Sequence, residues 1–587
     1  MYFGIGTMPK MNVSLRSLWS QEQVGLLLLG IAVGVLGGYG AVLLVKMIEW
    51  FRVLSYGSTG NFLDVLASHP WWYKLLAPMA GGLVVGPMIY FFAQEAKGHG
   101  VPEVMEAVSL RGGVIRKRVA VIKSVASAIS IAVGGAVGRE GPIIQIGSGI
   151  GSSVAQVLKL SPARMRILVG CGAAAGIAAA FNAPLAGAMF ALEIILGEFA
   201  ISSFSPIVMS SVMATAISRH YLGDKPAFAV PMYHLASGYE LVLYLLLGAA
   251  AAVVAVGFTT FLYKVEDIFD DWKFPGYLKA AAGGLLLGAI GLLAPWVMGV
   301  GYEGIELAMG EKLVWWLLLA IMAMKILASS VSLASGMSGG IFAPSLFMGA
   351  MLGGAFGHFA HYLFPHFTAG PGAYAIVGMA ALVAGTTHGP LSAFLILFEM
   401  TGTYNIILPL MIACVVATLV ARQIRPESIY TLKLLRRGVD IEGGKEMNTL
   451  RSLTVSEAMR RDVVSVPNGM KLGDFFDTVV RSKFSSFPVV NERDELVGVV
   501  GHADYAEHAF DKDLWDVVVV QDLATRNVVY TTPTETLAGA LRKISTRDFA
   551  TLPVVAGEQD HRLVGIISHR DIISVYSRQL QKSSINA

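Results

Sequence analysis

Long apolar stretches alternate with short polar ones over the first 440 residues. A helix needs about 20 apolar residues to cross a hydrocarbon core about 30 Å thick. The clearest spanning candidates are residues 25–45, 74–93, 119–137, 241–263, 278–297, 313–330 and 406–419. Other apolar stretches are shorter or broken by glycine and proline, and they lie around 142–157, 166–195, 341–360 and 373–400. This pattern predicts ten or more helical segments, some of which do not cross the membrane completely.

The pattern changes after residue 440. Of the 85 Asp, Glu, Lys and Arg residues, 37 lie in the last 147 residues. The whole chain is 14% charged, against about 25% in soluble proteins, and its mean hydropathy is +0.62. By the positive-inside rule, the basic cluster after the last apolar stretch places the following domain in the cytoplasm; it comprises Arg422, Arg425, Lys433, Arg436 and Arg437. We expect an all-α polytopic membrane domain over residues 1–437, a linker over 438–451 and a soluble domain over 452–580.

Composition and motifs exclude several classes of protein. Residues 1–24 lack the apolar run and cleavage site of a signal peptide. Both cysteines, Cys171 and Cys414, lie in apolar stretches, so no disulfide framework is indicated. The net charge of +3 gives no indication of nucleic-acid binding. None of the twelve histidines is followed by glutamate, so the His-Glu-x-x-His zinc motif of intramembrane metalloproteases is absent. We expect no enzyme activity and no metal centre.

The membrane region repeats itself. Residues 138–142 (Gly-Arg-Glu-Gly-Pro) have a counterpart in residues 340–344 (Gly-Ile-Phe-Ala-Pro). Two proline–glutamate pairs share a nine-residue spacing, Pro184 with Glu193 and Pro390 with Glu399. Two such halves, roughly 20–220 and 240–437, indicate inverted-topology repeats with discontinuous helices, and such proteins bind their substrate where the repeats meet.

Glycine and proline cluster inside the apolar stretches at 138–142, 176–184, 336–344 and 385–390. Close packing of helices explains isolated glycines, but these clusters predict helices that begin inside the membrane. A helix start presents unpaired N–H groups and about half a positive charge, and irregular backbone at this depth is tolerated where it lines a cavity. Several converging starts can replace the hydration shell of an anion and still release it.

Glu140 lies inside one of these clusters. An acidic residue at the bilayer centre costs about 2.5–3.5 kcal/mol on insertion scales, and neighbouring helix starts offset that cost. The functional interpretation is a titratable group in an anion pathway, and the alternative is a structural ion pair with Arg139. For Glu193 and Glu399, the matching places in the two halves favour helix-packing roles.

Three sequences occur in a fixed order, Gly-His-Gly-Val-Pro-Glu at 98–103, then 138–142, then 340–344, and Tyr430 follows the last apolar stretch. Together they resemble the signature sequences of the CLC chloride channel and transporter family, over about residues 20–435. The resemblance implies a homodimer with one pore in each subunit, located in the plasma (inner) membrane.

The resemblance also implies roles for single residues. Glu140 matches the gating glutamate, whose carboxylate occupies an anion position and swings out when protonated. Backbone amides of Ile341 and Phe342 match the central anion site, and those of Arg139, Glu140 and Gly141 match the outer one. Tyr430 would donate its hydroxyl to the anion from the cytoplasmic side.

His99 departs from the family pattern, which commonly has serine at this position. An imidazole can also donate to an anion, but it is bulkier than a hydroxyl and can become charged. Alternatively, the side chain points away and only the backbone of His99 contributes. Fluoride-specific relatives differ in the other two sequences, whereas this chain keeps Pro142 and Phe342, so we expect chloride as the substrate.

Ile194 is the second departure. Proton-coupled exchangers of the family carry a glutamate at this position, on the inner route of the proton, and isoleucine cannot carry a proton. This favours channel-like conduction. The alternative is a proton/chloride antiporter whose protons pass through water or Glu193.

A divalent-cation transporter with a regulatory tail is a more distant alternative. A path for cations should show paired intramembrane Asp or Glu residues and helix C-termini rich in carbonyl groups. Here the broken segments begin with glycine and proline, and Glu140 stands next to Arg139.

The tail contains a second repeat, with an offset of 65–67 residues. Residues 464–467, 487–490 and 496–500 recur at 529–533, 552–555 and 563–567. Short β-rich runs alternate with helical stretches at 472–482 and 537–546, which predicts two small α/β units. This resembles a tandem pair of CBS domains, with boundaries of about 452–512 and 517–580.

The resemblance to CBS domains implies a regulatory adenosine nucleotide, and transport itself needs no cofactor. In the second copy, Asp571 would accept hydrogen bonds from the ribose hydroxyls and Ser568 would face the phosphates. The first copy has Gly501 in place of that serine, so at most one good site is expected. The alternative is a purely structural dimerisation module.

Overall fold

The structure is a computed structural model that describes residues 21–94, 97–224, 235–402, 404–441, 450, 453–482, 484, 486–506, 512–547 and 550–585. The chain forms two compact units, Met1–Arg436 and Arg437–Ala587. Residues 1–20, in which we expected no signal peptide, lie outside the described residues, and so do positions 442–449 and 451 of the expected linker.

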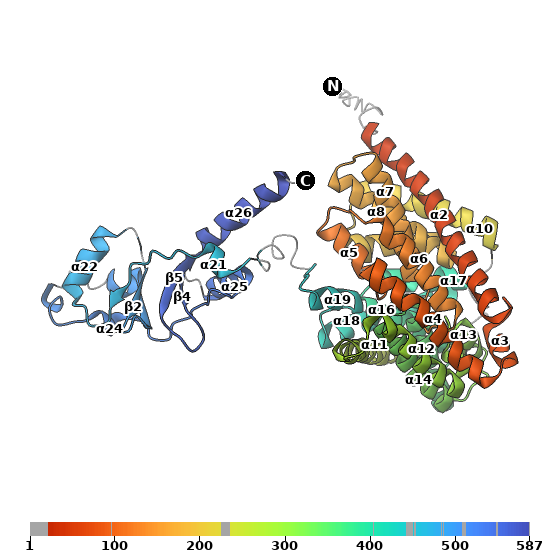
Figure 1. The fold of residues 1–587 in the computed structure, drawn as a ribbon. Coiled ribbons are helices and arrows are strands. Elements are labelled where there is room, and N and C mark those ends of the chain that lie inside the picture. Colours follow the sequence, from red (N-terminus) through yellow and green to blue (C-terminus); the bar gives the residue numbers. More distant parts are fainter. Residues whose placement is uncertain are drawn as a thin grey trace, which may run out of the picture. The chain divides into compact units, whose positions relative to one another are not determined.

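The first unit is entirely helical in its described residues (Figure 1). Among the residues described, eight helices are long and apolar enough to cross a membrane, and shorter helices lie between them. The first half comprises α2 (Gln21–Tyr56), α3 (Phe62–Ser68), α4 (Trp71–Phe92), α5 (Val101–Ser109), α6 (Lys117–Ala132), α7 (Glu140–Val157), α8 (Pro162–Phe181), α9 (Pro184–Phe190), η2 (Ala191–Leu196) and α10 (Ile201–Leu222). The second half comprises α11 (Glu240–Asp271), α12 (Lys279–Leu293), α13 (Tyr302–Met309), α14 (Trp315–Ser335), α15 (Phe342–Leu363), α16 (Pro371–Thr387), α17 (Pro390–Thr401), α18 (Ile407–Ile424) and α19 (Ile429–Arg436). The expected fold class is confirmed.

Prolines and residues in the left-handed backbone conformation lie at the breaks between helices. Helices α8, α9, α16 and α17 begin with proline, whose missing N–H is not needed in the first turn. Asn182 ends α8 and His388 ends α16, each with a φ of 58°. A non-glycine residue in this conformation is uncommon, and it recurs in the same place in both halves. The structure therefore repeats the pattern seen in the sequence.

Glycines bring the paired helices of each half into contact. A methyl group on Gly147 of α7 would overlap the carbonyl oxygen of Gly172 on α8. A methyl group on Gly349 of α15 would overlap the carbonyl oxygen of Gly378 on α16 in the same way. Small residues let membrane helices approach this closely, so these glycines are needed for packing.

Two expected spans are shorter than the apolar pattern suggested. Helix α6 ends at Ala132, before residue 137, because Gly134 adopts a φ of 99°. Helix α12 ends at Leu293, and Pro295 follows two residues later. The remaining residues of the first stretch form a loop, and Pro295–Val297 of the second form a short 3-10 helix, η4.

The second unit contains two copies of a small α/β motif. In the first, β1 (Val466–Pro467) pairs in parallel with β2 (Ser486–Val490), which pairs antiparallel with β3 (Leu496–Gly501). In the second, β4 (Thr551–Val555) pairs antiparallel with β5 (Leu563–Ser568), and Thr531 forms a parallel bridge to Val554. Helices complete both copies: α21 (Val455–Ala458), α22 (Leu472–Arg481), α23 (His502–Ala506), α24 (Val520–Leu523), α25 (Leu537–Arg547) and α26 (His569–Ile585).

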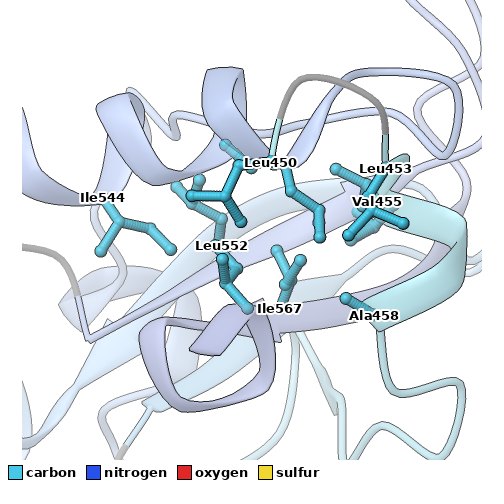
Figure 2. Packing of buried hydrophobic residues seen from close by; sticks show 11 residues of the cluster. Leu450, Leu453, Val455, Ala458, Ile544, Leu552 and Ile567 are labelled. Atoms are coloured by element: carbon cyan, nitrogen blue, oxygen red, sulfur yellow. The ribbon is translucent and has the colours of Figure 1, made fainter. Parts of the chain in front are cut away.

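Each copy completes the core of the other. Figure 2 shows Leu453 and Val455, from the start of the first copy, packed against Leu552 and Ile567 on the strands of the second. Conversely, Val520 at the start of the second copy is buried in the core of the first. Because each core contains residues from both copies, we expect the two copies to fold as one module.

Candidate anion pathway

Backbone hydrogen bonds join the three glycine-containing sequences. The N–H of Gly138 donates to Gly340 O (2.8 Å), and the N–H of Gly340 donates to Gly138 O (2.6 Å). Gly98 forms a parallel bridge with Ser338, just before the third sequence. Segments separated by more than 200 residues thus meet in the interior of the unit, as expected for an interface between repeats.

Three helices begin where these segments meet. Helix α5 starts after Gly100, α7 starts at Glu140 and α15 starts at Phe342, and these starting residues are buried. A methyl group on Gly141 would overlap the carbonyl oxygen of His99 and lie 3.2 Å from Gly340 Cα, so the three starts are in direct backbone contact. The N–H groups of a first helical turn have no partner within their own helix, and together with the partial positive charge of a helix start they suit an anion.

The carboxylate of Glu140 lies between the second and third sequences. The side chain is fully buried, and Tyr302 donates its hydroxyl to Oε1 (3.4 Å). A methyl group on Gly138 would overlap Oε2, and one on Gly340 would lie 3.3 Å from it. Oε2 is buried with no hydrogen-bond partner among the described residues. A carboxyl oxygen thus already occupies space between two helix starts.

Arg139 does not form the structural ion pair considered as the alternative for Glu140. Its guanidinium donates to Ala180 O (3.1 Å) and lies 5.7 Å from the centre of the Tyr302 ring. Within the part of the chain that the structure describes, no salt bridge links Arg139 and Glu140. The carboxylate is therefore not fixed by Arg139.

His99 and Tyr430 lie together, with ring centroids 5.8 Å apart, and both side chains are buried. Tyr263 of α11 links to both segments: its hydroxyl donates to Ile429 O (2.5 Å) and lies 3.4 Å from His99 Nε2. The structure thus groups the candidate residues predicted from the sequence; their contact with an anion stays a prediction.

Comparisons with known proteins agree with this arrangement. Residues 81–422 match the model of the family described as voltage gated chloride channel. The chain belongs to this family. A ClcB-like chloride channel protein of Ralstonia nicotianae is 36% identical over 414 residues, which cover 69% of this chain and 96% of that protein. The H(+)/Cl(-) exchange transporter ClcA of Salmonella arizonae is 34% identical over 70% of this chain and 89% of its own length.

A solved structure and the matches of the C-terminal unit extend the comparison. A crystal structure titled as a slow cyanobacterial Cl-/H+ antiporter superimposes with a TM-score of 0.63 at 30% identity, over 70% of this chain and 97% of that one. Residues 455–510 and 520–578 match the CBS domain model. The chain is thus an integral membrane protein of the CLC family with a tandem pair of CBS domains.

Two buried lysines in this CLC pathway did not stand out in the sequence. Lys123 of α6 donates to Gly98 O, and Lys325 of α14 donates to Val297 O (2.9 Å) and Gly299 O (3.0 Å). Each lysine precedes the proline of its helix start, Pro142 or Pro344, by 19 residues. That equal spacing could have revealed them. Both ammonium groups hold a loop that leads to a broken helix.

The loop before α13 repeats the first glycine sequence. Gly98 and Gly100 have φ values of 91° and 87°, and Gly299 and Gly301 have values of 64° and 94° before α13 begins at Tyr302. The shared Gly-x-Gly spacing was the available signal. This second-half loop supplies Tyr302, the residue that donates to Glu140.

Glu193 and Glu399 cap helices in opposite halves. Glu193 accepts hydrogen bonds from the N–H groups of Leu391 (3.1 Å) and Ser392 (2.7 Å), at the start of α17. Glu399 accepts from the N–H groups of Leu185 (3.0 Å) and Ala186 (2.7 Å), at the start of α9. This crosswise capping supports the helix-packing roles expected for both residues.

We predict that Glu399→Ala destabilises the protein. The substitution removes two charge-assisted hydrogen bonds from a partly buried helix start, which costs about 2–4 kcal/mol. The measurement is thermal unfolding of the purified protein in detergent. Glu399→Gln keeps one acceptor oxygen and should cost less. Equal unfolding temperatures for wild type and Glu399→Ala would show that the cap adds nothing.

Ile194 is buried, and its side chain carries no titratable group. A methyl group on the neighbouring Gly389 would lie 2.7 Å from Ile194 Cδ1 and 3.1 Å from Glu193 Oε2. Because both oxygens of Glu193 accept hydrogen bonds from α17, this residue is poorly placed to relay protons.

In the CBS pair, both carboxylate oxygens of Asp571 already accept hydrogen bonds. Its Oδ2 accepts from the N–H (3.0 Å) and hydroxyl (2.5 Å) of Ser568, and its Oδ1 accepts from Arg460 Nε (2.8 Å). In the first copy, Asp504 accepts from the N–H of Gly501 (2.7 Å). A ribose at Asp571 would have to displace or share Arg460.

A cavity in the second copy is lined by residues other than the expected nucleotide-binding pair. Its volume is about 720 Å³, and its lining includes Tyr530, Thr531, Thr532, Lys543 and Glu558. Ser568 and Asp571, the residues expected to bind a nucleotide, are not part of that lining. The expected nucleotide site stays a prediction.

Proposed function

We propose that this protein exchanges chloride for protons across the membrane, with Glu140 as the group that both ions use. The observation that carries the proposal is the buried carboxylate of Glu140 between the starts of α7 and α15, with Oε2 unpaired among the described residues. When ionised, the carboxylate competes with chloride for the same positive region. When protonated, it can leave that region to the anion.

The comparisons support exchange over the channel-like conduction favoured by Ile194. One relative at 34% identity is named an exchange transporter, and a structure at 30% identity is titled an antiporter. Because Glu193 is held by α17, protons would reach Glu140 from the cytoplasm through water rather than along a chain of carboxylates.

Ion flux in liposomes tests the proposal. We expect an imposed chloride gradient to drive protons uphill, and the reversal potential to shift with a pH gradient at constant chloride. A reversal potential that follows chloride alone would establish a channel. No halide flux at any pH or voltage would refute anion transport altogether.

The proposal includes a homodimer in the plasma (inner) membrane, with the CBS pair in the cytoplasm. Basic residues at the end of the membrane unit support this orientation, because positive charge is retained on the cytoplasmic side; among them are Arg422, Arg425, Lys433 and Arg436. Cross-linking and mass measurement in detergent test the dimer.

The CBS pair is proposed to bind an adenine nucleotide at Ser568 and Asp571. Asp571→Ala should weaken ATP binding measured by calorimetry, because it removes an acceptor for the ribose hydroxyls. Asp504→Ala is the matched control, since Asp504 occupies the same position in the copy that lacks the serine. Unchanged ATP binding in Asp571→Ala would reject the assignment and favour a structural module.

A further inference from the structure

The loop that leads into α13 is held in place on two sides. Lys325 of α14 donates to Gly299 O (3.0 Å), and the N–H of Gly299 donates to Gly134 O in the first half (2.9 Å). A methyl group on Gly301 would lie 2.7 Å from the ring of Phe347 on α15. The backbone at the start of α13 therefore has little freedom to move.

Tyr302 is the first residue of α13, and its hydroxyl donates to Glu140 Oε1 (3.4 Å). The guanidinium of Arg139 lies 5.7 Å from the centre of the same ring. The two oxygens of Glu140 thus have different surroundings. Oε1 accepts from Tyr302, whereas Oε2 lies between the starts of α7 and α15, where a methyl group on Gly340 would be 3.3 Å from it.

The strength of the hydrogen bond from Tyr302 depends on the charge of the carboxyl group. A hydroxyl that donates to an ionised carboxylate makes a bond about twice as strong as one between neutral groups. At 3.4 Å the bond is longer than the usual O–H···O range of about 2.5–3.0 Å, so we expect a moderate contribution. Tyr302 therefore holds Glu140 more firmly in its ionised form, which is the form that competes with chloride in the proposed function.

We infer that Tyr302 is a positioning residue that holds the ionised carboxylate of Glu140 in the anion pathway and so opposes chloride there. The inference rests on the proposed function, in which the carboxylate and chloride compete. The second half of the repeat supplies the hydroxyl, and the first half supplies the carboxylate 162 residues away. Because the loop before α13 is fixed, the carboxylate is the group that moves when chloride enters.

Chloride binding to the full chain in detergent tests this, measured by calorimetry in alkaline buffer so that the carboxylate is ionised. Tyr302→Phe removes the hydroxyl and keeps the ring beside Arg139. We expect this variant to bind chloride at least about threefold more tightly than wild type, because a hydrogen bond that favours the competing carboxylate is lost. If the hydroxyl instead bound the anion directly, chloride affinity would fall.

A second background separates positioning of Glu140 from a general structural role. In Glu140→Ala the carboxylate is absent, so adding Tyr302→Phe should leave chloride affinity unchanged. Tyr244→Phe is the matched control, because the Tyr244 hydroxyl also donates to a buried glutamate, Glu240 Oε1 (3.3 Å), but at the start of α11. This control should leave chloride affinity unchanged in both backgrounds.

Tyr302→Leu, which also lacks the hydroxyl, replaces Tyr302→Phe if the phenylalanine variant does not fold, and the expected direction is the same. An unchanged or weaker chloride affinity in the variant without the hydroxyl would overturn the inference, and so would an equal gain in the Glu140→Ala background. Absence of halide binding and flux in the wild type would instead count against the proposed function. A wild type that transports chloride, together with no effect of Tyr302→Phe, would reject only the role of Tyr302.

Discussion

Substituting Glu140 by alanine is expected to abolish proton transport while chloride still passes. The carboxylate is the acidic group between the starts of α7 and α15, and its removal leaves their N–H groups available to the anion. Proton flux driven by a chloride gradient should fall to background. Chloride flux should lose the part of its pH dependence that comes from protonation of Glu140. The measurement is simultaneous recording of chloride and proton flux from liposomes.

Glu140→Gln separates the charge of the side chain from its volume. Glutamine fills about the same space but cannot lose a proton, so it should be as uncoupled as alanine. Retained proton transport in either variant would place the essential proton carrier elsewhere. Loss of all chloride flux in a folded Glu140→Ala protein would contradict a gating role, because a gate should open when it is removed.

The helix starts could be predicted from the sequence because their causes are local. Glycine and proline clustered together favour helix ends and helix starts, so the clusters at 138–142 and 340–344 mark the starts of α7 and α15 without knowledge of the fold. The proline-led starts of α9 and α17 follow from the same reasoning. Tyr430 was found by its position after the last apolar stretch, and His99 as the residue that replaces serine in the sequence at 98–103. The structure places their rings side by side.

Long-range contacts were not predictable in the same way. Lys123 and Lys325 lie in apolar helices, and only the fold reveals that their ammonium groups meet the carbonyls of Gly98 and Gly299. Tyr302 donates to a glutamate 162 residues away. Apolar stretches also overstated some spans, since the stretch that contains α6 continues past the glycine that ends the helix.

The crosswise caps add a constraint that the repeat alone does not give. Glu193 belongs to the first half but fixes the start of α17 in the second, and Glu399 does the reverse at α9. Neither half can complete its own short helix. We therefore expect the two halves to be stable only together, which keeps the helix starts at their interface in register.

Gly141→Ala is expected to disrupt the centre of the pathway. The added methyl group would overlap His99 O and lie 3.2 Å from Gly340 Cα. Both neighbours are backbone atoms, so neither can rotate away, and the starts of α5, α7 and α15 must separate. Overpacking of a rigid core costs about 1–3 kcal/mol or more, and the larger effect should be on transport, because the N–H groups no longer converge. We expect chloride flux at least about tenfold below wild type, since a misplacement of about 1 Å can cost about a hundredfold.

Gly257→Ala is the matched control for Gly141→Ala. Gly257 also lies in a helix of the membrane unit, α11, but a methyl group there has no atom within 4 Å. Alanine is a better helix former than glycine by about 0.8–1 kcal/mol, so this variant should unfold at the same or a higher temperature and transport chloride normally. Flux would be measured with equal amounts of folded protein from size-exclusion chromatography. If Gly141→Ala transported chloride as fast as Gly257→Ala, the backbone contact of α5, α7 and α15 would not be what holds the anion.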